Sequence, residues 1–191
     1  VNTMIQKYYP EALPFLAPVL SPMQAHCKRI KEQDPEAKTV FIGPCIAKKV
    51  EAREHRETIN YVLSFEEIMC MLEGKDIKFA EMSGDAAYER DASKLGLSFP
   101  LTAGVSAAVQ DTVAAMGGEV HNAQYCSGLD KCRDTVKAAA AGKLDCSYIE
   151  GMACPNGCID GPDTVATSTS RRLPDEICCG SPQQAGCPRQ A

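Results

Sequence analysis

Short apolar runs alternate along the chain with longer segments in which apolar residues recur at helical spacing. The short runs, bounded by turn-forming residues, predict strands at 39–42, 61–63, 120–125 and 145–150. The longer segments predict helices at 1–9, 22–33, 65–73, 103–116 and 129–141. This order of elements predicts an α/β fold with two lobes of short, mainly parallel strands flanked by helices.

Capping residues sharpen three of these helix boundaries. Ser21 before Pro22 is typical of an N-cap followed by a first-turn proline. Ser64 and Glu67 have the spacing of a capping box. Thr102 is the expected cap of the helix at 103–116.

The remaining segments predict less order: a loop or short turns at 10–22, a solvated helix or loop at 47–56, and irregular chain at 75–101. The β-branched run at 39–42 is typical of a buried strand.

The composition of the 191 residues is that of an ordinary globular protein, with 24% charged and 45% hydrophobic residues. A net charge of −5 argues against nucleic acid as a partner. No apolar run approaches the roughly 20 residues that span a bilayer, and no signal-peptide pattern precedes the first helix. We therefore expect a cytoplasmic protein with no membrane partner. Its 11 cysteines, an odd number, then indicate metal or redox chemistry rather than disulfides.

Two loops that follow predicted strands carry the most informative cysteines. Cys154 and Cys158 flank a segment with Pro155 and Gly157, which allow a tight turn that brings two sulfurs toward one point. Such a loop suits an iron–sulfur cluster; zinc is less usual at this spacing, and two packed cysteines are the plain alternative. Cys45 follows the strand at 39–42, and the lysines just after it favour a thiolate, although a core cysteine is also possible.

The other cysteines carry a weaker signal. Cys27 and Cys70 lie in predicted helices and are expected in the core. Packing is also the expectation for Cys126, Cys132 and Cys146. The C-terminal segment could bind a metal through Cys178, Cys179 and Cys187, but it has no recognisable ligand motif.

The two cysteine loops together resemble a known family. Residues 44–51, PCIAKKVE, are similar to the second signature of the iron-only (FeFe) hydrogenases, M-P-C-x-x-K-K-x-E. Residues 150–158, EGMACPNGC, resemble the third signature, E-x-M-A-C-P-G-G-C. The resemblance covers residues 1–172 as a partial catalytic domain and leaves 173–191 as an irregular tail.

The resemblance implies an H-cluster, a 4Fe-4S cluster joined to a diiron subsite with CO and CN ligands, in an iron–sulfur site between the two lobes. Cys45 and Cys154 match ligands of the 4Fe-4S cluster, and Cys158 matches the ligand that also bridges to the diiron subsite. Lys48 matches the lysine that hydrogen-bonds a cyanide, so Lys48 and Cys158 are the expected catalytic residues. The residues that line the diiron pocket are matched by Pro44 and Met152. The implied partners are an electron carrier such as ferredoxin and the maturation proteins.

The resemblance is incomplete. The first signature, T-S-C-C-P, is expected just before Val1 and is absent, so we expect the chain alone to be inactive in H2 turnover. Gly43 stands where the family has Met, and Asn156 where it has Gly. Besides an enzyme of reversible proton reduction to H2, the motifs allow a non-catalytic H2 or redox sensor with the same cluster. A hydrogenase-like iron–sulfur assembly protein is a third reading, against which Lys48 weighs.

Overall fold

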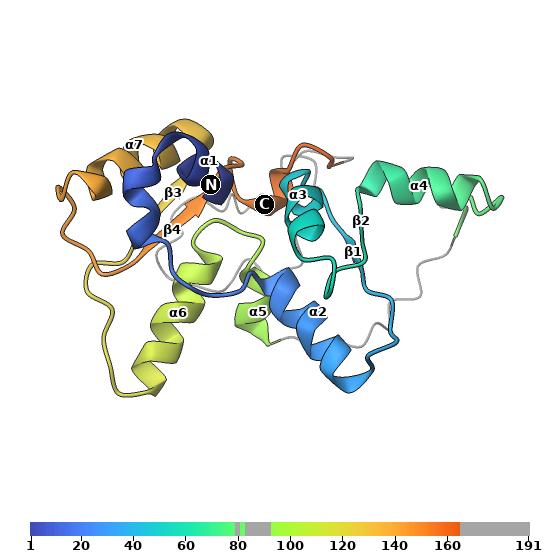
Figure 1. The fold of residues 1–191 in the computed structure, drawn as a ribbon, viewed down its shortest axis with the longest axis horizontal. Helices are drawn as coiled ribbons and strands as arrows, with labels where there is room; N and C mark the ends of the chain where they lie inside the picture. The colour runs from blue at the N-terminus through green and yellow to red at the C-terminus, as the bar shows by residue number, and fades with distance from the viewer. Residues whose placement is uncertain (79–80, 83–92, 165–191) are drawn as a thin grey trace, which may run out of the picture. The chain divides into compact units, whose positions relative to one another are not determined.

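The computed structural model describes residues 1–78, 81–82 and 93–164. These residues form two compact units, which we describe one at a time (Figure 1). The first unit contains residues 1–16 and 93–159; the second contains 17–78, 81–82 and 160–164. The expected tail at 173–191, with its three cysteines, lies outside the described residues.

The first unit is built around a pair of parallel strands. Its elements are α1 (Asn2–Tyr8), η1 (Pro10–Phe15), α5 (Lys94–Ser98), α6 (Gly104–Ala115), β3 (Gln124–Ser127), α7 (Leu129–Ala140) and β4 (Ile149–Met152). β3 pairs with β4 in parallel, with Gln124 opposite Ile149. α7 joins the two strands and contacts both of them, as well as η1. A strand, a helix and a second parallel strand are the α/β unit that the sequence predicted.

The second unit repeats this arrangement. Its elements are α2 (Pro22–Gln33), β1 (Val40–Ile42), α3 (Ala47–Glu54), β2 (Tyr61–Leu63) and α4 (Phe65–Glu73). β1 and β2 are parallel, and α3 connects them. The core consists of the buried residues Met23, Cys27, Ala52 and Ile59, with Phe41 and Val62 packed against them. The prediction of an α/β fold with short parallel strands is thus confirmed, and so is the core position of Cys27.

The prediction that the strand at 39–42 is buried is wrong for one of its faces. Successive side chains of a strand point to opposite sides, so Phe41 faces the core while its two neighbours cannot. Val40 and Ile42 are 49% and 45% exposed. A three-residue strand in a two-stranded sheet has only one covered face.

Both serine caps predicted from the sequence are present. Ser21 Oγ accepts a hydrogen bond from the Gln24 amide at 3.2 Å and begins α2. Ser64 Oγ accepts from the Glu67 amide at 3.2 Å, and the Glu67 carboxylate accepts from the Ser64 amide at 2.8 Å. Each cap satisfies backbone N–H groups that the first helical turn leaves without partners.

Several boundaries differ from the predictions. β3 (Gln124–Ser127) and β4 (Ile149–Met152) begin four residues later and end two residues later than predicted, because the hydrogen-bonded register continues past the apolar residues that marked the strands. Ser93 begins α5 inside the segment expected to be irregular, accepting from the Gly96 amide at 3.1 Å. The charged segment at 47–56, predicted to be a helix or a loop, forms helix α3 over residues 47–54. Thr102 is not the cap of α6, whose N-cap residue is Ala103.

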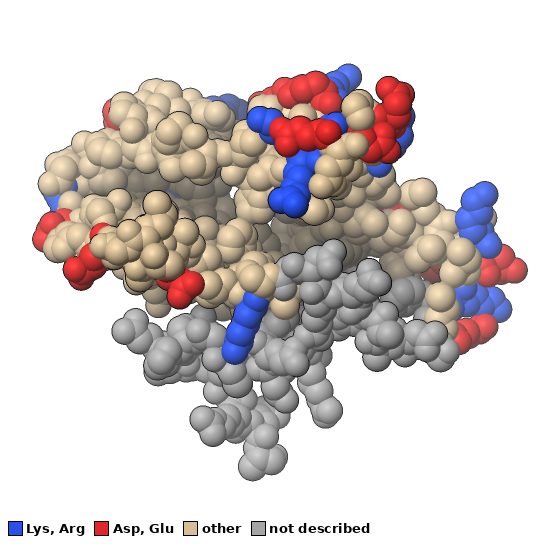
Figure 2. Space-filling view, turned by 90° about the horizontal axis from the view of Figure 1, so that it is seen from below, with Lys and Arg blue, Asp and Glu red and all other residues tan. Residues whose placement is uncertain are grey.

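No helix in the described part of the chain is long and apolar enough to cross a membrane. On the face shown in Figure 2, Lys and Arg side chains lie among Asp and Glu side chains. Among the described residues, Arg133 pairs with Asp130 at 3.0 Å and Lys78 with Glu81 at 3.5 Å.

Candidate metal centre

The loop that follows β4 carries two of the predicted ligands, Cys154 and Cys158. The Gly157 amide donates to the Cys154 carbonyl at 3.1 Å, which closes a tight turn. Asn156 and Gly157 both have left-handed backbones, with φ of 60° and 97°. Glycine adopts this region without steric cost, and asparagine tolerates it better than most residues. The turn therefore explains how Asn156 can stand where the family has a glycine.

Gly157 is also required by close packing. A Cβ at this position would lie 2.4 Å from the Pro100 carbonyl oxygen and 2.8 Å from the Thr102 nitrogen. Gly157 forms an antiparallel bridge with Leu101, and the Thr102 amide donates to the Asn156 carbonyl at 3.2 Å. The backbone of residues 100–102 thus fixes the turn between the two cysteines.

Ser127, the last residue of β3, holds the same loop from another side. Its Oγ accepts from the Asn156 amide at 3.0 Å and lies 3.2 Å from Thr102 Oγ1. Sequence reasoning missed this residue. The only available signal was a small polar residue at the carboxyl end of a strand, where α/β folds often place functional groups.

Glu150 anchors β4 to the start of α6. Its side chain is buried, with 5% exposure, and its two carboxylate oxygens accept from the amides of Ala103 at 2.8 Å and Ser106 at 2.6 Å. The carboxylate thereby does the capping that we had expected of Thr102. Ala103 sits at φ 67°, an uncommon region for a residue with a Cβ, and its bond to Glu150 helps to hold it there. Burial raises the pKa of Glu150, although these backbone bonds oppose the rise.

The second unit places Cys45 just beyond β1. The Gly43 amide continues the strand pairing by donating to the Leu63 carbonyl at 3.1 Å. The Cys45 carbonyl accepts from the Lys48 amide at 3.2 Å, in the turn that leads into α3. A Cβ at Gly43 would lie 2.8 Å from the Phe41 ring. A larger residue at this position would therefore require the Phe41 ring to shift.

Lys48 is held by a carboxylate on its own helix. Its Nζ lies 2.6 Å from Glu51 Oε2. The hydroxyl of Ser21 donates to the other oxygen of Glu51. A lysine ammonium has three N–H donors, so this ion pair orients Lys48 and leaves donors for a further acceptor. The sequence identified Ser21 only as a helix cap and Glu51 only as part of the motif at 44–51; their role in holding Lys48 was not predicted.

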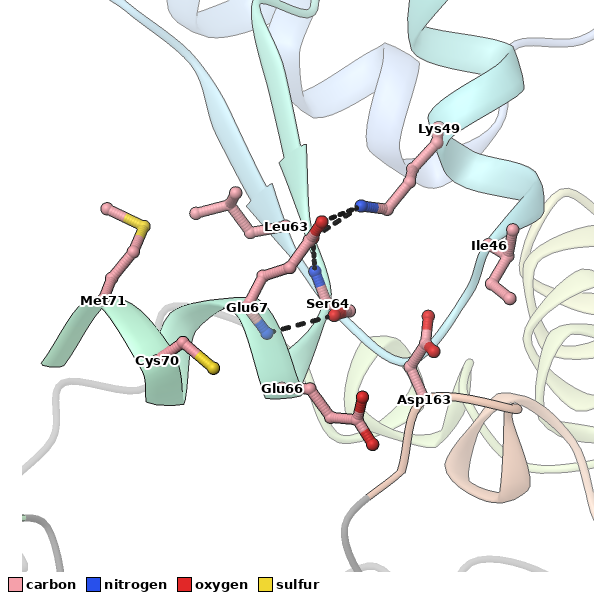
Figure 3. A pocket seen from close by; sticks show the side chains of 9 residues that line it. All are labelled: Ile46, Lys49, Leu63, Ser64, Glu66, Glu67, Cys70, Met71 and Asp163. Carbon is pink, nitrogen blue, oxygen red and sulfur yellow. Dashed lines mark hydrogen bonds and ion pairs between the residues drawn. The ribbon is translucent and has the colours of Figure 1, made fainter. Parts of the chain in front are cut away.

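The neighbouring lysine points to α4 instead. Lys49 Nζ lies 2.6 Å and 2.5 Å from the two carboxylate oxygens of Glu67 (Figure 3). This ion pair lowers the pKa of Glu67. Both lysines after Cys45 are thus paired with carboxylates. The expected electropositive surrounding of Cys45 is correspondingly weaker than the sequence suggested.

A pocket of about 680 Å³ lies beside the Lys49–Glu67 pair. It is lined by residues of the second unit: Ile46, Lys49, Leu63, Ser64, Glu66, Glu67, Cys70, Met71 and Asp163. Cys70 is exposed on α4, so the prediction of a core position for it is wrong. No residue of α4 is buried: Phe65, Ile68, Met69 and Leu72 are half-buried, whereas Cys70 and Met71 are exposed.

The predicted ligands lie on separate elements. Cys154 and Cys158 share one loop of the first unit, and Cys45 belongs to the second unit. Within residues 1–78, 81–82 and 93–164, no three side chains of His, Cys, Asp or Glu converge on a single metal position. The two other predicted site residues flank the cysteines: Pro44 accepts from the Asp163 amide at 3.4 Å, and Met152 ends β4.

The donor chemistry nevertheless fits an iron–sulfur cluster. Each predicted ligand is a thiol in a loop that begins at the carboxyl end of a parallel strand, and cysteine thiolates are the usual ligands of such clusters. Hard oxygen-binding cations would need carboxylates at these positions. The described residues thus supply soft donors in the two loops that the sequence singled out.

Comparison with known proteins identifies the family. Residues 1–162 match the family described as iron only hydrogenase large subunit, C-terminal domain. The chain therefore belongs to the iron-only hydrogenase large-subunit family. It is 28% identical over 200 aligned positions to the periplasmic Fe hydrogenase large subunit of Nitratidesulfovibrio vulgaris, covering 82% of this chain and 47% of that protein. It thus spans about half the length of the curated relative.

Solved structures of FeFe-hydrogenases share the fold. A variant of apo HydA1 from Chlamydomonas reinhardtii matches with a TM-score of 0.62 and 17% identity, over 86% of this chain and 59% of that one. The HydA(deltaEFG) structure, which concerns stepwise assembly of the H-cluster, matches with a TM-score of 0.61 and 16% identity, over 86% and 60%. At these identities the likeness establishes the fold.

The Glu150 cap predicts a graded loss of stability on substitution. Glu150→Ala leaves the amides of Ala103 and Ser106 without their acceptor and should lower the free energy of unfolding by about 1–3 kcal/mol. Glu150→Gln keeps one side-chain oxygen and should lose less. Urea unfolding followed by circular dichroism measures both. Equal stability of the wild type and Glu150→Ala would show that the cap is dispensable.

The same variants predict a pH dependence. Because burial raises the pKa of Glu150 above its ordinary 4.5, the folded state binds a proton more readily than the unfolded state. The stability contributed by the protonated form is therefore fully present below pH 4.5 and is lost as the pH rises through the raised pKa. The difference in unfolding free energy between wild type and Glu150→Gln should fall over that range and then level off. A difference that grows with pH would contradict the assignment.

The Gly157 turn predicts opposite outcomes for two adjacent substitutions. Gly157→Ala places a methyl group against the Pro100 carbonyl in a left-handed conformation, and should cost about 1–3 kcal/mol and expose the Thr102 amide. Asn156→Gly keeps the turn and should leave stability nearly unchanged. Hydrogen exchange at Thr102 and urea midpoints report both effects. Undiminished protection of Thr102 in Gly157→Ala would mean that the close packing does not hold the loop.

Proposed function

We propose that this chain is the cluster-binding part of an iron-only hydrogenase, an oxidoreductase of the reaction 2H⁺ + 2e⁻ ⇌ H2. The observation that carries the proposal is the Cys154–Cys158 loop. Its turn depends on a glycine packed against the backbone of residues 100–102. Two cysteines that merely fill space do not need a turn fixed in this way, whereas thiolate ligands need fixed directions.

The three cysteines have distinct proposed roles. Cys45 and Cys154 act as thiolate ligands of a 4Fe-4S cluster, and Cys158 as the ligand that also connects to the diiron subsite. When bound, the diiron subsite with its CO and CN ligands supplies the H2 chemistry. The chain contributes the thiolates and the backbone that directs them. Since Cys158 is the most exposed of the three, its direction depends most on the turn at Asn156 and Gly157.

Lys48 is the proposed donor to an anionic cyanide. A charged donor gives the stronger kind of hydrogen bond to an anion. Glu51 holds the Lys48 ammonium at 2.6 Å, and Ser21 holds Glu51, so the donor is oriented before any ligand arrives. Pro44 and Met152 stand next to the ligand cysteines and would shield the diiron subsite from water.

A sensor of H2 or redox state with the same cluster is the second candidate. The Phe41 ring fills the space beside Gly43, so the surroundings of that position differ from those of a chain with a methionine there. Altered surroundings tune a cluster without changing its ligands. A sensor would retain the cluster and its CO and CN ligands but show no sustained H2 turnover.

A hydrogenase of this kind needs an electron carrier such as ferredoxin, and maturation proteins to supply the diiron subsite. We propose the cytoplasm as its compartment, because ligand thiols must stay reduced until they bind iron. The Nitratidesulfovibrio relative is named as a periplasmic protein, so the periplasm is the alternative compartment. Fractionation of the native cells, with detection of this chain by antibody, decides between the two compartments.

The ligand assignment predicts the iron content of two matched triple variants. After reconstitution with iron and sulfide under nitrogen, the variant with Cys45, Cys154 and Cys158 all changed to alanine should lose most of its bound iron. The control with Cys27, Cys70 and Cys146 changed to alanine should keep the wild-type iron content. Iron and acid-labile sulfide assays measure both, with circular dichroism to show that each variant is folded. Equal iron in the two variants would refute the ligand set.

The role of Lys48 predicts a selective loss at the diiron subsite. In the protein expressed with its natural flanking sequence and matured, Lys48→Ala removes a charged hydrogen bond worth about 1.5–3 kcal/mol. The infrared bands of CO and CN⁻ should weaken or shift while the 4Fe-4S signal persists. Lys49→Ala is the matched control, because Lys49 pairs with Glu67 instead. Identical bands in Lys48→Ala and wild type would leave Lys48 as an ion-pair partner of Glu51 only.

A further inference from the structure

Two cysteines outside the proposed ligand set lie in contact inside the first unit. Cys126 in β3 is 6% exposed, and Cys132 in α7 is fully buried. Their sulfur atoms are 3.2 Å apart. The prediction that both cysteines pack in the interior is confirmed, but packing alone does not require two thiols to meet.

Both thiols also bind the strand that leads to the cysteine loop. Cys132 Sγ donates to the Met152 carbonyl at 3.2 Å, and Cys126 Sγ lies 3.5 Å from the Glu150 carbonyl. Burial, together with the hydrogen bond to Cys126, raises the pKa of Cys132 to about 12. The two sulfurs thus contact each other and the backbone of β4.

We propose that Cys126 and Cys132 form an intramolecular disulfide when the protein meets a peroxide. Cys126, whose residue is 6% exposed while Cys132 is fully buried, is oxidised first: its thiol and H2O2 give a sulfenic acid and water. The Cys132 sulfur then attacks the Cys126 sulfur, and the sulfenic oxygen leaves as a second water with the thiol proton. The two thiols thus lose two electrons and two protons, and the peroxide is reduced to two waters.

The local geometry favours closure of this bond. A disulfide joins sulfurs about 2.0 Å apart, so the two sulfurs need to approach by only a small movement. The intervening turn contains Gly128 at φ 90°, and nothing lies within 4 Å of where its Cβ would be. The turn therefore has room to adjust.

Oxidation would alter the support of the cysteine loop. A disulfide has no S–H groups, so the Met152 carbonyl loses its thiol donor. Met152 keeps one bond, from the Gly128 amide at 2.9 Å, and the Glu150 side chain still caps α6. Cys154 follows Met152 by two residues. Oxidation of the Cys126–Cys132 pair would therefore change the hydrogen bonding of the strand end from which the proposed ligand loop begins. The proposed disulfide can form whether or not the cysteine loops bind a cluster.

The chain offers a direct test by peptide mapping. Cleavage after lysine separates residues 95–131, whose only cysteine is Cys126, from residues 132–137, whose only cysteine is Cys132. The iron-free full chain is treated with H2O2, denatured in acid, alkylated and digested. We expect the two peptides to appear joined, at their summed mass less two hydrogens, and to separate on reduction with dithiothreitol.

Two variants complete the design. Cys27→Ser changes another buried cysteine and should leave the joined peptides unchanged. Cys132→Ser should abolish them and leave Cys126 as sulfenic or sulfinic acid. The proposal is overturned if the wild-type peptides stay unjoined while exposed Cys70 is fully oxidised, or if Cys126 is found joined to another cysteine. The wild-type digest alone shows whether the disulfide forms, so a folding defect in Cys132→Ser would not affect the test. If the proposed ligand cysteines fail to bind iron, the result for the disulfide is also unchanged.

Discussion

The close approach of Gly157 to the backbone of residues 100–102 is the constraint on which the candidate site of the first unit depends. No residue with a Cβ fits there, since it would stand 2.4 Å from the Pro100 carbonyl oxygen in a left-handed conformation. The contact fixes the turn between Cys154 and Cys158 and brings residues 101 and 102 into hydrogen bonding with the loop. The next residue, Ala103, is then in place to donate to Glu150, which begins α6. One glycine contact thus ties the loop, the strand before it and the adjacent helix together.

The second unit reaches a related arrangement by different means. Cys45 also stands at the carboxyl end of a parallel strand, but its loop is short and leads at once into α3. Ser21 contacts Glu51, and Glu51 pairs with Lys48. These contacts orient the Lys48 ammonium, three residues after Cys45, and at the same time pair its charge with a carboxylate. Because Lys48 and Lys49 are each paired with a carboxylate, the loop has little excess positive charge. An anion would therefore be selected by the direction of a hydrogen-bond donor rather than by net charge. The fold shared with FeFe-hydrogenases and the family match cover both loops.

Much of this could be predicted from the sequence because local signals decide it. The N-cap at Ser21, the capping box at Ser64, the α/β order of elements and the two cysteine loops depend on residues close together in the chain. What escaped prediction depends on contacts across long sequence separations. Glu150 caps a helix that begins more than 40 residues earlier, and Gly157 packs on a segment with no periodicity. Cys70 was wrongly placed in the core because it belongs to a helix rich in apolar residues. The half-buried residues Phe65, Ile68, Met69 and Leu72 recur at helical spacing on one face, and Cys70 lies off that face and is exposed.

The central claim is that the thiols of these loops bind an iron–sulfur cluster, and Mössbauer spectroscopy of the chain reconstituted with ⁵⁷Fe and sulfide tests it most directly. The isomer shift and quadrupole splitting distinguish iron in a cubane, where each iron has sulfur neighbours and shares its electrons, from single iron ions bound by separate thiolates. The account predicts the quadrupole doublets of a 4Fe-4S cluster as the main component, and their loss when Gly157→Ala disturbs the turn. A spectrum of isolated ferrous or ferric ions, or one that Gly157→Ala leaves unchanged, would contradict it.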